Sequence, residues 1–338
     1  MTAAEAAALD PQQRLLLECS YEAMENSGHS LDEVMGSNTS VFVGSFCADY
    51  TDMLWRDPET VPMYQCTNAG HSRANIANRL SYFYDLKGPS VTIDTACSTS
   101  LVALHLGCQS LRTGDAKQAL VAGASVILSH EVMVTMSMMK FVPVLSPVRM
   151  NTKFPRFMSP DGRCYTFDER ASGYARGEGV GCLLLKPLAD ALKDRDTIRA
   201  VIRGTGSNQD GKTPGITMPN GVAQEELVRS VYETAGLDPL ETDYVECHGT
   251  GTQAGDPLET GAISRVFGRN RADYDPLRIG SVKTNVGHLE GASGVAGVIK
   301  TILMLENNVF LPNRNFKKAN PRIPLEEWKL KVSLMRSN

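Results

Sequence analysis

Cys97 is the first residue whose type and position could carry chemistry. It lies in "DTACSTS", Asp94 to Ser100, between an apolar run that predicts a strand closing at Asp94 and an amphipathic run that predicts a helix from about Ser98. At the N-terminus of a helix, unpaired N–H groups and the helix dipole favour a thiolate and lower the pKa of the thiol. The same spacing also fits an inert cysteine packed under the helix, which is the commoner state of a free thiol.

Two histidines lie at matching places in the predicted pattern. His248 closes the strand-like "YVEC" and precedes the glycine-rich "GTGTQAGDP", and His288 follows "SVKTNVG" and precedes "LEGASG". Both therefore lie where predicted strands end, the usual place for the active site of a parallel α/β sheet. One such histidine is more often structural, but two in similar contexts favour a function. Lys283 and Asn285 share the loop of His288, where a lysine could hold a ligand or be an ordinary exposed side chain. The remaining histidines are predicted to be structural or on the surface: His29, His71, His105 and His130.

A third motif imitates a phosphate-binding loop. "GSNQDGKT", Gly206 to Thr213, matches the G-x-x-x-x-G-K-[ST] pattern and follows a predicted strand. A phosphate loop needs a helix that starts at its Lys-Thr pair, so that the helix N-terminus meets the phosphate. Here "PGITMPNG" follows, which opposes a helix. We therefore expect a polar loop beside a pocket and no bound nucleotide. A metal site is also not expected, because H-x-x-x-H and C-x-x-C spacings are absent from the sequence.

The elements that must position these residues alternate along the chain. The N-terminal 28 residues predict an amphipathic helix, and a proline-rich stretch at 142–157 predicts an irregular exposed loop. Strands alternating with helices of this length predict an α/β fold with largely parallel, buried strands. Strands are predicted at 40–46, 118–128, 179–188, 198–208 and 242–249, a turn and strand at 87–94, a strand and loop at 277–287, and helices at 69–86, 98–114, 221–237, 256–268 and 291–308.

Composition narrows the classes of protein to consider. The chain has 338 residues, 42% hydrophobic and 21% charged, with a formal net charge of −4 and no basic stripe, so neither nucleic acid nor a membrane is an expected partner. No apolar run approaches the ~18 residues of a membrane span. The eight cysteines show no dense disulfide spacing, and we expect them to be reduced and mostly buried, in a cytoplasmic protein.

Four blocks of sequence resemble the ketosynthase (beta-ketoacyl synthase) domain of type I polyketide synthases. Their residues are most similar to those of the fungal, iterative, highly reducing subclass. The blocks are "GPSVTIDTACSTSLVALHLGCQSLRTGD", "MSPDGRCYTFDERASGYARGEGVG", "VECHGTGTQAGDP" and "SVKTNVGHLEGASG", and they run in family order. The resemblance implies a thiolase-like fold, a five-layered αβαβα sandwich of two similar halves, usually a homodimer. The halves would be 1–190, with the cysteine and an insertion at 142–157, and 191–338, with the two histidines.

The resemblance also implies a Cys-His-His site. Cys97 would accept the acyl chain from an acyl carrier protein, whose phosphopantetheine arm delivers it, so that the domain itself binds no cofactor. His248 and His288 would assist decarboxylation of the malonyl carrier and stabilise the enolate, and Lys283, in the loop shared with Asn285, would support His288. Neutral imidazoles supply the N–H donors that an enolate needs, and a nearby lysine disfavours imidazolium. The implied partners are the acyl carrier protein and acyltransferase domains.

The chain departs from the family pattern at both ends, and we expect it to be a truncated domain. The first family strand is missing before Met1, and after "KVSLMRSN" the family continues to a glycine-rich loop that completes the oxyanion hole. A catalytically silent fragment or scaffold is therefore the alternative to an active enzyme. A degradative thiolase is disfavoured, because it would need a second catalytic cysteine near the C-terminus, and the last cysteine here is Cys247.

Overall fold

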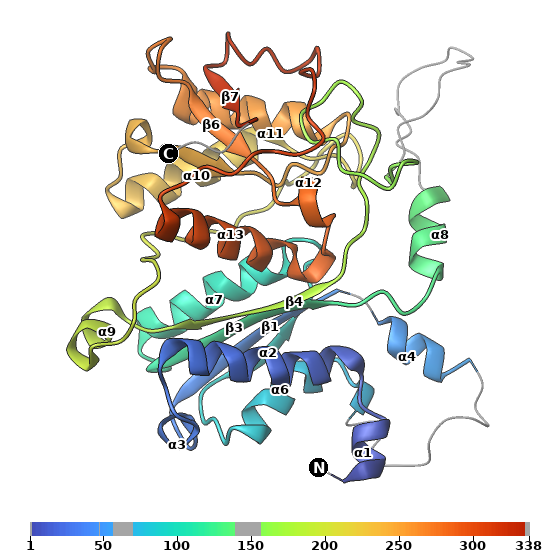
Figure 1. The fold of residues 1–338 in the computed structure, drawn as a ribbon, viewed down its shortest axis with the longest axis vertical. Coiled ribbons are helices and arrows are strands. Elements are labelled where there is room, and N and C mark those ends of the chain that lie inside the picture. The colour runs from blue at the N-terminus through green and yellow to red at the C-terminus, as the bar shows by residue number, and fades with distance from the viewer. Residues whose placement is uncertain (1, 47, 57–69, 139–156, 335–338) are drawn as a thin grey trace. The chain divides into compact units, whose positions relative to one another are not determined.

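The computed structural model describes residues 2–46, 48–56, 70–138 and 157–334, which form two compact units (Figure 1). Unit 1 comprises Met1–His130, Gly177–Val201 and Leu289–Ile299, and unit 2 comprises Glu131–Arg176, Ile202–His288 and Lys300–Asn338. The predicted loop at 142–157 lies, apart from Phe157, outside the described residues.

The centre of unit 1 is a four-stranded sheet with the order β2-β1-β3-β4. Its strands are β1 (Thr39–Ser45), β2 (Ser90–Ile93), β3 (Gln118–Ser125) and β4 (Gly179–Leu185). β1 runs parallel to both of its neighbours, and β4 pairs with β3 in the antiparallel sense. β1 is buried along its whole length, as expected for a central strand covered on both faces.

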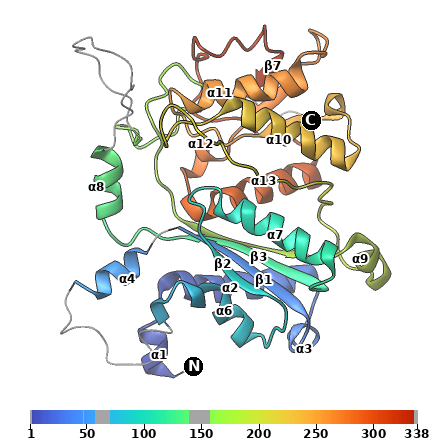
Figure 2. The ribbon, with the colours of Figure 1, turned by 180° about the vertical axis from the view of Figure 1, so that it is seen from behind.

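Helices cover both faces of this sheet. The helices α2 and α6 lie on one face and α7 on the other, as Figures 1 and 2 show from opposite sides. Leu16, Leu80 and Leu120 are fully buried in the core between the sheet and the first pair of helices. The helices of unit 1 are α1 (Ala3–Ala7), α2 (Pro11–Ser27), α3 (Leu31–Val34), α4 (Asp49–Leu54), α6 (Ala74–Phe83), α7 (Thr99–Thr113), α9 (Leu188–Asp194) and the 3-10 turn η3 (Glu290–Ala292).

The prediction of one continuous N-terminal helix was wrong. The chain forms α1 and then α2, because Asp10 caps the second helix by accepting from the Gln12 N–H at 2.8 Å. Pro11 occupies the first turn of α2, where its missing N–H costs nothing and its fixed φ suits a helix start.

Unit 2 is built on a smaller parallel sheet with the order β5-β6-β7. The strands are β5 (Tyr244–Glu246), β6 (Leu277–Gly280) and β7 (Leu330–Val332). Leu277 and Ile279 are fully buried and pack in a core with Phe167 and Phe267. The helices of unit 2 are α8 (Glu131–Met138), α10 (Gly221–Ala235), the 3-10 turn η1 (Pro239–Glu241), α11 (Gly255–Ile263), the π-helical turn η2 (Ser264–Gly268) and α12 (Lys283–Val286). The long helix α13 (Ser293–Asn307) contributes its first part to unit 1 and its remainder to unit 2.

The predicted strand at 198–208 was also wrong, because this segment is irregular in the structure. A strand needs a ladder partner, and no strand of the described residues pairs with it. Gly204 and Gly206 instead lie against Val231 and Leu227 of α10.

The other predicted helices and strands are present with shifted ends, and the predicted α/β class is confirmed. Within the described ranges, no helix combines the length and the apolar character needed to cross a membrane. Six cysteines have described positions and all are free thiols; Cys108, Cys164 and Cys247 are buried, and Cys19, Cys97 and Cys182 are half-buried.

Candidate active site

Cys97 lies in unit 1, in the turn between β2 and α7. Ile93 ends the strand, Ser98 is the N-cap residue, and the helix begins at Thr99. The preceding residue, Ala96, has a φ of 54°, a left-handed conformation that is uncommon for a side chain with a Cβ. This tight turn places the half-buried thiol close to the N-terminus of a 15-residue helix, as the sequence predicted.

Three hydrogen bonds hold this turn in place. Thr99 Oγ1 accepts from the Thr95 N–H at 2.7 Å, and the Asp94 carboxylate accepts from the Ala96 N–H at 3.1 Å. From η3 and α13, Ser293 Oγ donates to the carbonyl of Cys97 at 3.1 Å. The backbone on both sides of the cysteine is therefore fixed, which supports the strained conformation of Ala96.

Gly44 in β1 leaves space for the start of α7. A Cβ at Gly44 would lie 2.9 Å from the backbone N of Ser100, closer than any real Cβ contact. The close approach of strand and helix behind Cys97 therefore requires glycine at this position.

His248 lies in unit 2, two residues after β5, and its backbone is held from several sides. Glu259 of α11 accepts from the His248 N–H at 2.5 Å and from the Gly249 N–H at 2.9 Å. Ser281 Oγ donates to the His248 carbonyl at 3.2 Å, and Thr166 Oγ1 donates to the Gly249 carbonyl at 2.5 Å. Gly249 has a φ of 48°, so the loop turns sharply after the histidine.

A second carboxylate of α11 supports the same loop. Asp256 is buried and accepts from the N–H groups of Phe167 and Gly251 at 2.8 and 3.0 Å. Burial raises the pKa of Asp256 to about 7, against the opposing effect of these hydrogen bonds. Together Glu259 and Asp256 replace the ladder partners that the glycine-rich loop lacks.

His288 follows α12 in unit 2 and is almost fully buried. Its N–H donates to the Ala175 carbonyl at 2.7 Å, and its ring lies 4.8 Å from the Tyr174 ring, measured between centroids. The His248 and His288 rings are 5.4 Å apart and nearly perpendicular. The structure therefore brings together the two histidines that the sequence singled out.

The charges around these rings favour neutral imidazoles. Burial, followed by the charges of His248, Lys283 and Arg176, lowers the pKa of His288 well below its ordinary value. Burial and the Lys283 ammonium also lower the pKa of His248, although part of the His248 surface still meets solvent, which moderates the effect. Glu259, the acidic group closest to the His248 backbone, does not reverse this direction. Both rings can then offer N–H donors to a developing negative charge at neutral pH.

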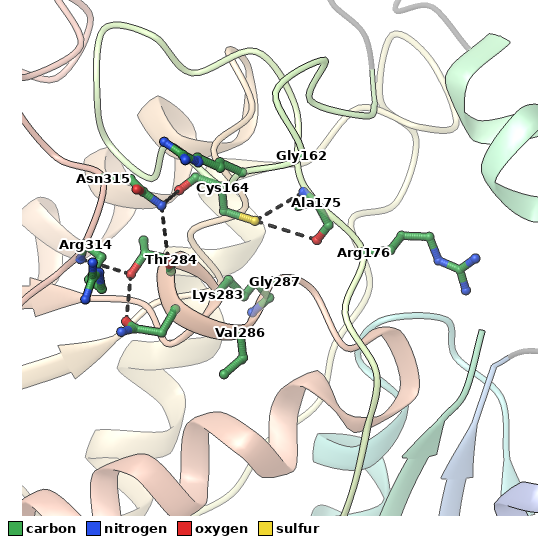
Figure 3. A pocket seen from close by; sticks show the side chains of 12 residues that line it. Gly162, Cys164, Ala175, Arg176, Lys283, Thr284, Val286, Gly287, Arg314 and Asn315 are labelled. Atoms are coloured by element: carbon green, nitrogen blue, oxygen red, sulfur yellow. Dashed lines mark hydrogen bonds between the residues drawn. The ribbon is translucent and has the colours of Figure 1, made fainter.

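Lys283 and Asn285 both belong to the short helix α12, but their environments differ. Lys283 is buried, whereas Asn285 is exposed. Both line a cavity of about 540 Å³ in unit 2, and Arg314 and Asn315 line it as well (Figure 3). Cys164 also lines it, and its Sγ accepts from the N–H of Ala175, the residue whose carbonyl holds His288.

The segment Gly206 to Thr213, which matches the phosphate-loop pattern, is not followed by a helix that starts at Lys212 and Thr213. The next helix, α10, starts only at Gly221, as the sequence predicted. Lys212 and Thr213 line a second cavity of about 430 Å³ with residues of α10 and α11. The expectation of a polar loop beside a pocket is therefore met.

The sequence did not identify Glu259 and Asp256 as part of the site. They lie three residues apart on α11, a spacing that places two side chains on the same side of a helix. That spacing, directly after "HGTGTQAG", was the available signal. Cys97 belongs to unit 1 and the histidines to unit 2, so a common Cys-His-His site stays a prediction, as does division of the chain into halves at 190/191.

Two family models match the chain. "Beta-ketoacyl synthase, N-terminal domain" matches residues 1–191, and "Beta-ketoacyl synthase, C-terminal domain" matches residues 199–317. Together they cover most of the chain and include all the candidate residues named above.

Similar proteins point the same way. The chain is 77% identical over 334 residues to the highly reducing polyketide synthase tstA of Talaromyces stipitatus, and 69% identical over 329 residues to a reducing polyketide synthase of Cochliobolus heterostrophus. These alignments cover 99% and 97% of this chain but 12% of each relative, so the chain spans about an eighth of their length. A solved ketosynthase from module 6 of the bacillaene synthase of Bacillus subtilis superposes with a TM-score of 0.87 at 39% identity, covering 100% of this chain and 55% of that one.

Proposed function

Since the chain belongs to the beta-ketoacyl synthase family of thiolase-like condensing enzymes, we propose that Cys97, His248 and His288 act together in a decarboxylative Claisen condensation. The observation that carries this proposal is the pair of perpendicular imidazoles beside the buried Lys283. Such a pair suits the stabilisation of an enolate, and a thiol at a helix N-terminus suits acyl transfer.

The proposed reaction has two steps. In the first, the Cys97 thiol loses its proton, its thiolate attacks the carbonyl of an acyl thioester, and the carrier thiolate leaves and takes up that proton. A malonyl thioester then loses CO2 to give an enolate, which His248 and His288 stabilise through their N–H groups. The enolate carbon attacks the acyl-Cys97 carbonyl, the Cys97 thiolate leaves, and the product is a β-ketoacyl thioester two carbons longer. Lys283 keeps the imidazoles neutral. Asn285 lines the 540 Å³ cavity that Lys283 also lines.

We propose that the acyl and malonyl groups arrive on the phosphopantetheine arm of an acyl carrier protein, loaded by an acyltransferase domain of the same polyketide synthase. The similarity to fungal reducing polyketide synthases supports this assignment to fatty-acid-like chain elongation. A cytoplasmic setting fits a reactive thiol, because thiols stay reduced there.

A homodimer is also part of the proposal. β2 is the last strand of its sheet, and among the described strands it pairs with β1 alone. Val91 on this edge and the nearby Tyr82 and Phe83 are exposed. An open edge with apolar neighbours is a template for pairing with a second copy. Sedimentation velocity tests this, and a monomer at every concentration would contradict it.

The central test is acylation of the 338-residue chain. The protein is incubated with an acyl-pantetheine thioester, and its intact mass is measured for the wild type, Cys97→Ala and Cys108→Ala. Cys108 is a matched control, because it lies on the adjoining helix α7 but is buried. We expect one acyl group on the wild type and on Cys108→Ala and none on Cys97→Ala. A folded wild type that stays unacylated would favour the silent-scaffold alternative.

A further inference from the structure

We propose that Glu246 is a positioning residue, which fixes the turn that carries Lys283 to the strand that carries His248. The inference rests on the proposed roles of Lys283 and the two histidines. It adds a residue outside the five sequence positions predicted for the site, and it assigns Lys300 as the counter-ion of Glu246.

The Glu246 carboxylate joins three parts of unit 2. Its Oε2 accepts from Lys300 Nζ at 2.6 Å and from the Tyr244 hydroxyl at 2.5 Å, and its Oε1 accepts from the Val282 N–H at 2.5 Å. The Glu246 and Lys300 side chains are only 12% and 10% exposed. A charge this deeply placed needs a partner, and Lys300 supplies it.

The bond to Val282 is the one that reaches the site. Val282 is the N-cap residue of α12 and directly precedes Lys283. Two more hydrogen bonds link the same segments, from the Cys247 N–H to the Gly280 carbonyl at 2.8 Å and from Ser281 Oγ to the His248 carbonyl at 3.2 Å. Residues 246–248 and 280–282 are therefore tied at three successive points, and Glu246 provides the tie nearest to Lys283.

Loss of the carboxylate should change how Lys283 faces the imidazoles. The cationic groups that act on His248 and His288 within unit 2 are Lys283 and Arg176, and the acidic group at the His248 backbone is Glu259. Only Lys283 lies on the turn that Glu246 holds. If Lys283 moves away, imidazolium becomes less unfavourable, and both histidines titrate at higher pH.

Glu246→Gln is the informative substitution, because glutamine keeps the size but removes the charge. The glutamine side chain has one oxygen, which accepts hydrogen bonds, and one NH2 group, which donates them. Whichever way it turns, the NH2 group faces a donor, either Lys300 and the Tyr244 hydroxyl or the Val282 N–H. The matched control is Glu225→Gln. Glu225 is also a partly buried carboxylate of unit 2, paired with Arg229 and Arg265, but it lies on α10.

The experiment measures two properties of the full chain. Histidine titration is followed by NMR of the imidazole C–H signals, and decarboxylation of malonyl-pantetheine is followed by mass spectrometry. We expect Glu246→Gln to raise the titration midpoints of His248 and His288 and to slow decarboxylation about 10- to 100-fold, as expected for loss of a hydrogen bond to a charged group. Glu225→Gln should leave both properties unchanged.

The outcomes separate this inference from the proposed function. A wild type that does not decarboxylate the thioester would contradict the proposed function, while the NMR titration would still test Glu246. Histidine midpoints that are the same in folded Glu246→Gln and the wild type would overturn the inference. If Glu246→Gln does not fold, Glu246→Asp is used instead: its shorter carboxylate cannot reach Val282 and Lys300 together, so the same rise in midpoint is expected and the same absence of change would refute the role.

Discussion

Replacing Asp168 with asparagine should destabilise unit 2 in a pH-dependent way. Asp168 is fully buried and joins the loop before Tyr174 to the segment that follows Arg314. One carboxylate oxygen accepts from Arg170 Nε at 2.6 Å, and the other accepts from the N–H groups of Lys317 and Lys318 at 2.6 and 3.1 Å. Asparagine must turn its NH2 group toward one of these donors.

The pKa of Asp168 sets the size of the effect. Burial opposes ionisation, but the Arg170 side chain and the N–H groups of Lys317, Arg170 and Lys318 outweigh it and lower the pKa from 3.8 to about 2. At 1.36 kcal/mol per pH unit, the ionised carboxylate then contributes about 2 kcal/mol to the free energy of unfolding at pH 7. Because the pKa of the folded state is the lower one, this contribution is complete above about pH 5 and is lost as the pH falls toward 2, with roughly half gone near pH 3.

Urea unfolding followed by circular dichroism between pH 7 and pH 3 measures this contribution. We expect Asp168→Asn to be at least about 2 kcal/mol less stable than the wild type at pH 7, with the difference shrinking by about 1 kcal/mol at pH 3. Asp190→Asn, which changes an exposed carboxylate of α9, is the control and should follow the wild type. The reasoning would be refuted if the difference in the free energy of unfolding between the wild type and Asp168→Asn were constant across this range. That difference depends on pH only if folding shifts the pKa of Asp168.

Two further predictions concern the surroundings of Cys97. Gly44→Ala should destabilise unit 1 by more than about 2 kcal/mol and slow acylation of Cys97, because the new methyl group meets the backbone of α7. Gly215→Ala, where the nearest atom is 3.6 Å away on the Met218 side chain, should change the thermal midpoint little, and equal midpoints for the two variants would contradict the packing argument. In native protein treated with iodoacetamide, peptide mapping should find Cys97 modified while Cys108, Cys164 and Cys247 stay unmodified, because burial hides these thiols and raises their pKa. Modification of Cys247 before Cys97 would contradict this order.

The sequence predicted the elements whose periodicity is local. The helices α7, α10 and α13 and the strands β1 and β3 follow from hydrophobic spacing together with glycine and asparagine caps. The segment 198–208 had the composition of a strand, but a strand also depends on a partner elsewhere in the chain. The split at Pro11 was readable from the Asp-Pro pair, which is a helix-start signal.

The site was predicted in part for a similar reason. His248 and His288 are found from strand ends, and their rings do lie together. The support that Asp256 gives to the loop after His248 could not be predicted from the sequence, because its carboxylate accepts from the Phe167 N–H, 89 residues away in the chain. The left-handed turn at Ala96 was hidden as well, since alanine gives no signal of that conformation.

The interleaving of the two units affects how the protein can be made. Unit 1 is complete only when Leu289–Ile299 has been added, and unit 2 draws on residues both before and after that segment. A nascent chain on the ribosome therefore lacks part of both units until residue 299 has been synthesised, so neither unit can be completed before that point. A cut between the two family models, at residues 191–199, would take Leu289–Ile299 away from the sheet against which it packs. Two polypeptides separated there would have to reassociate, because unit 1 needs Leu289–Ile299 from the second and unit 2 needs Glu131–Arg176 from the first.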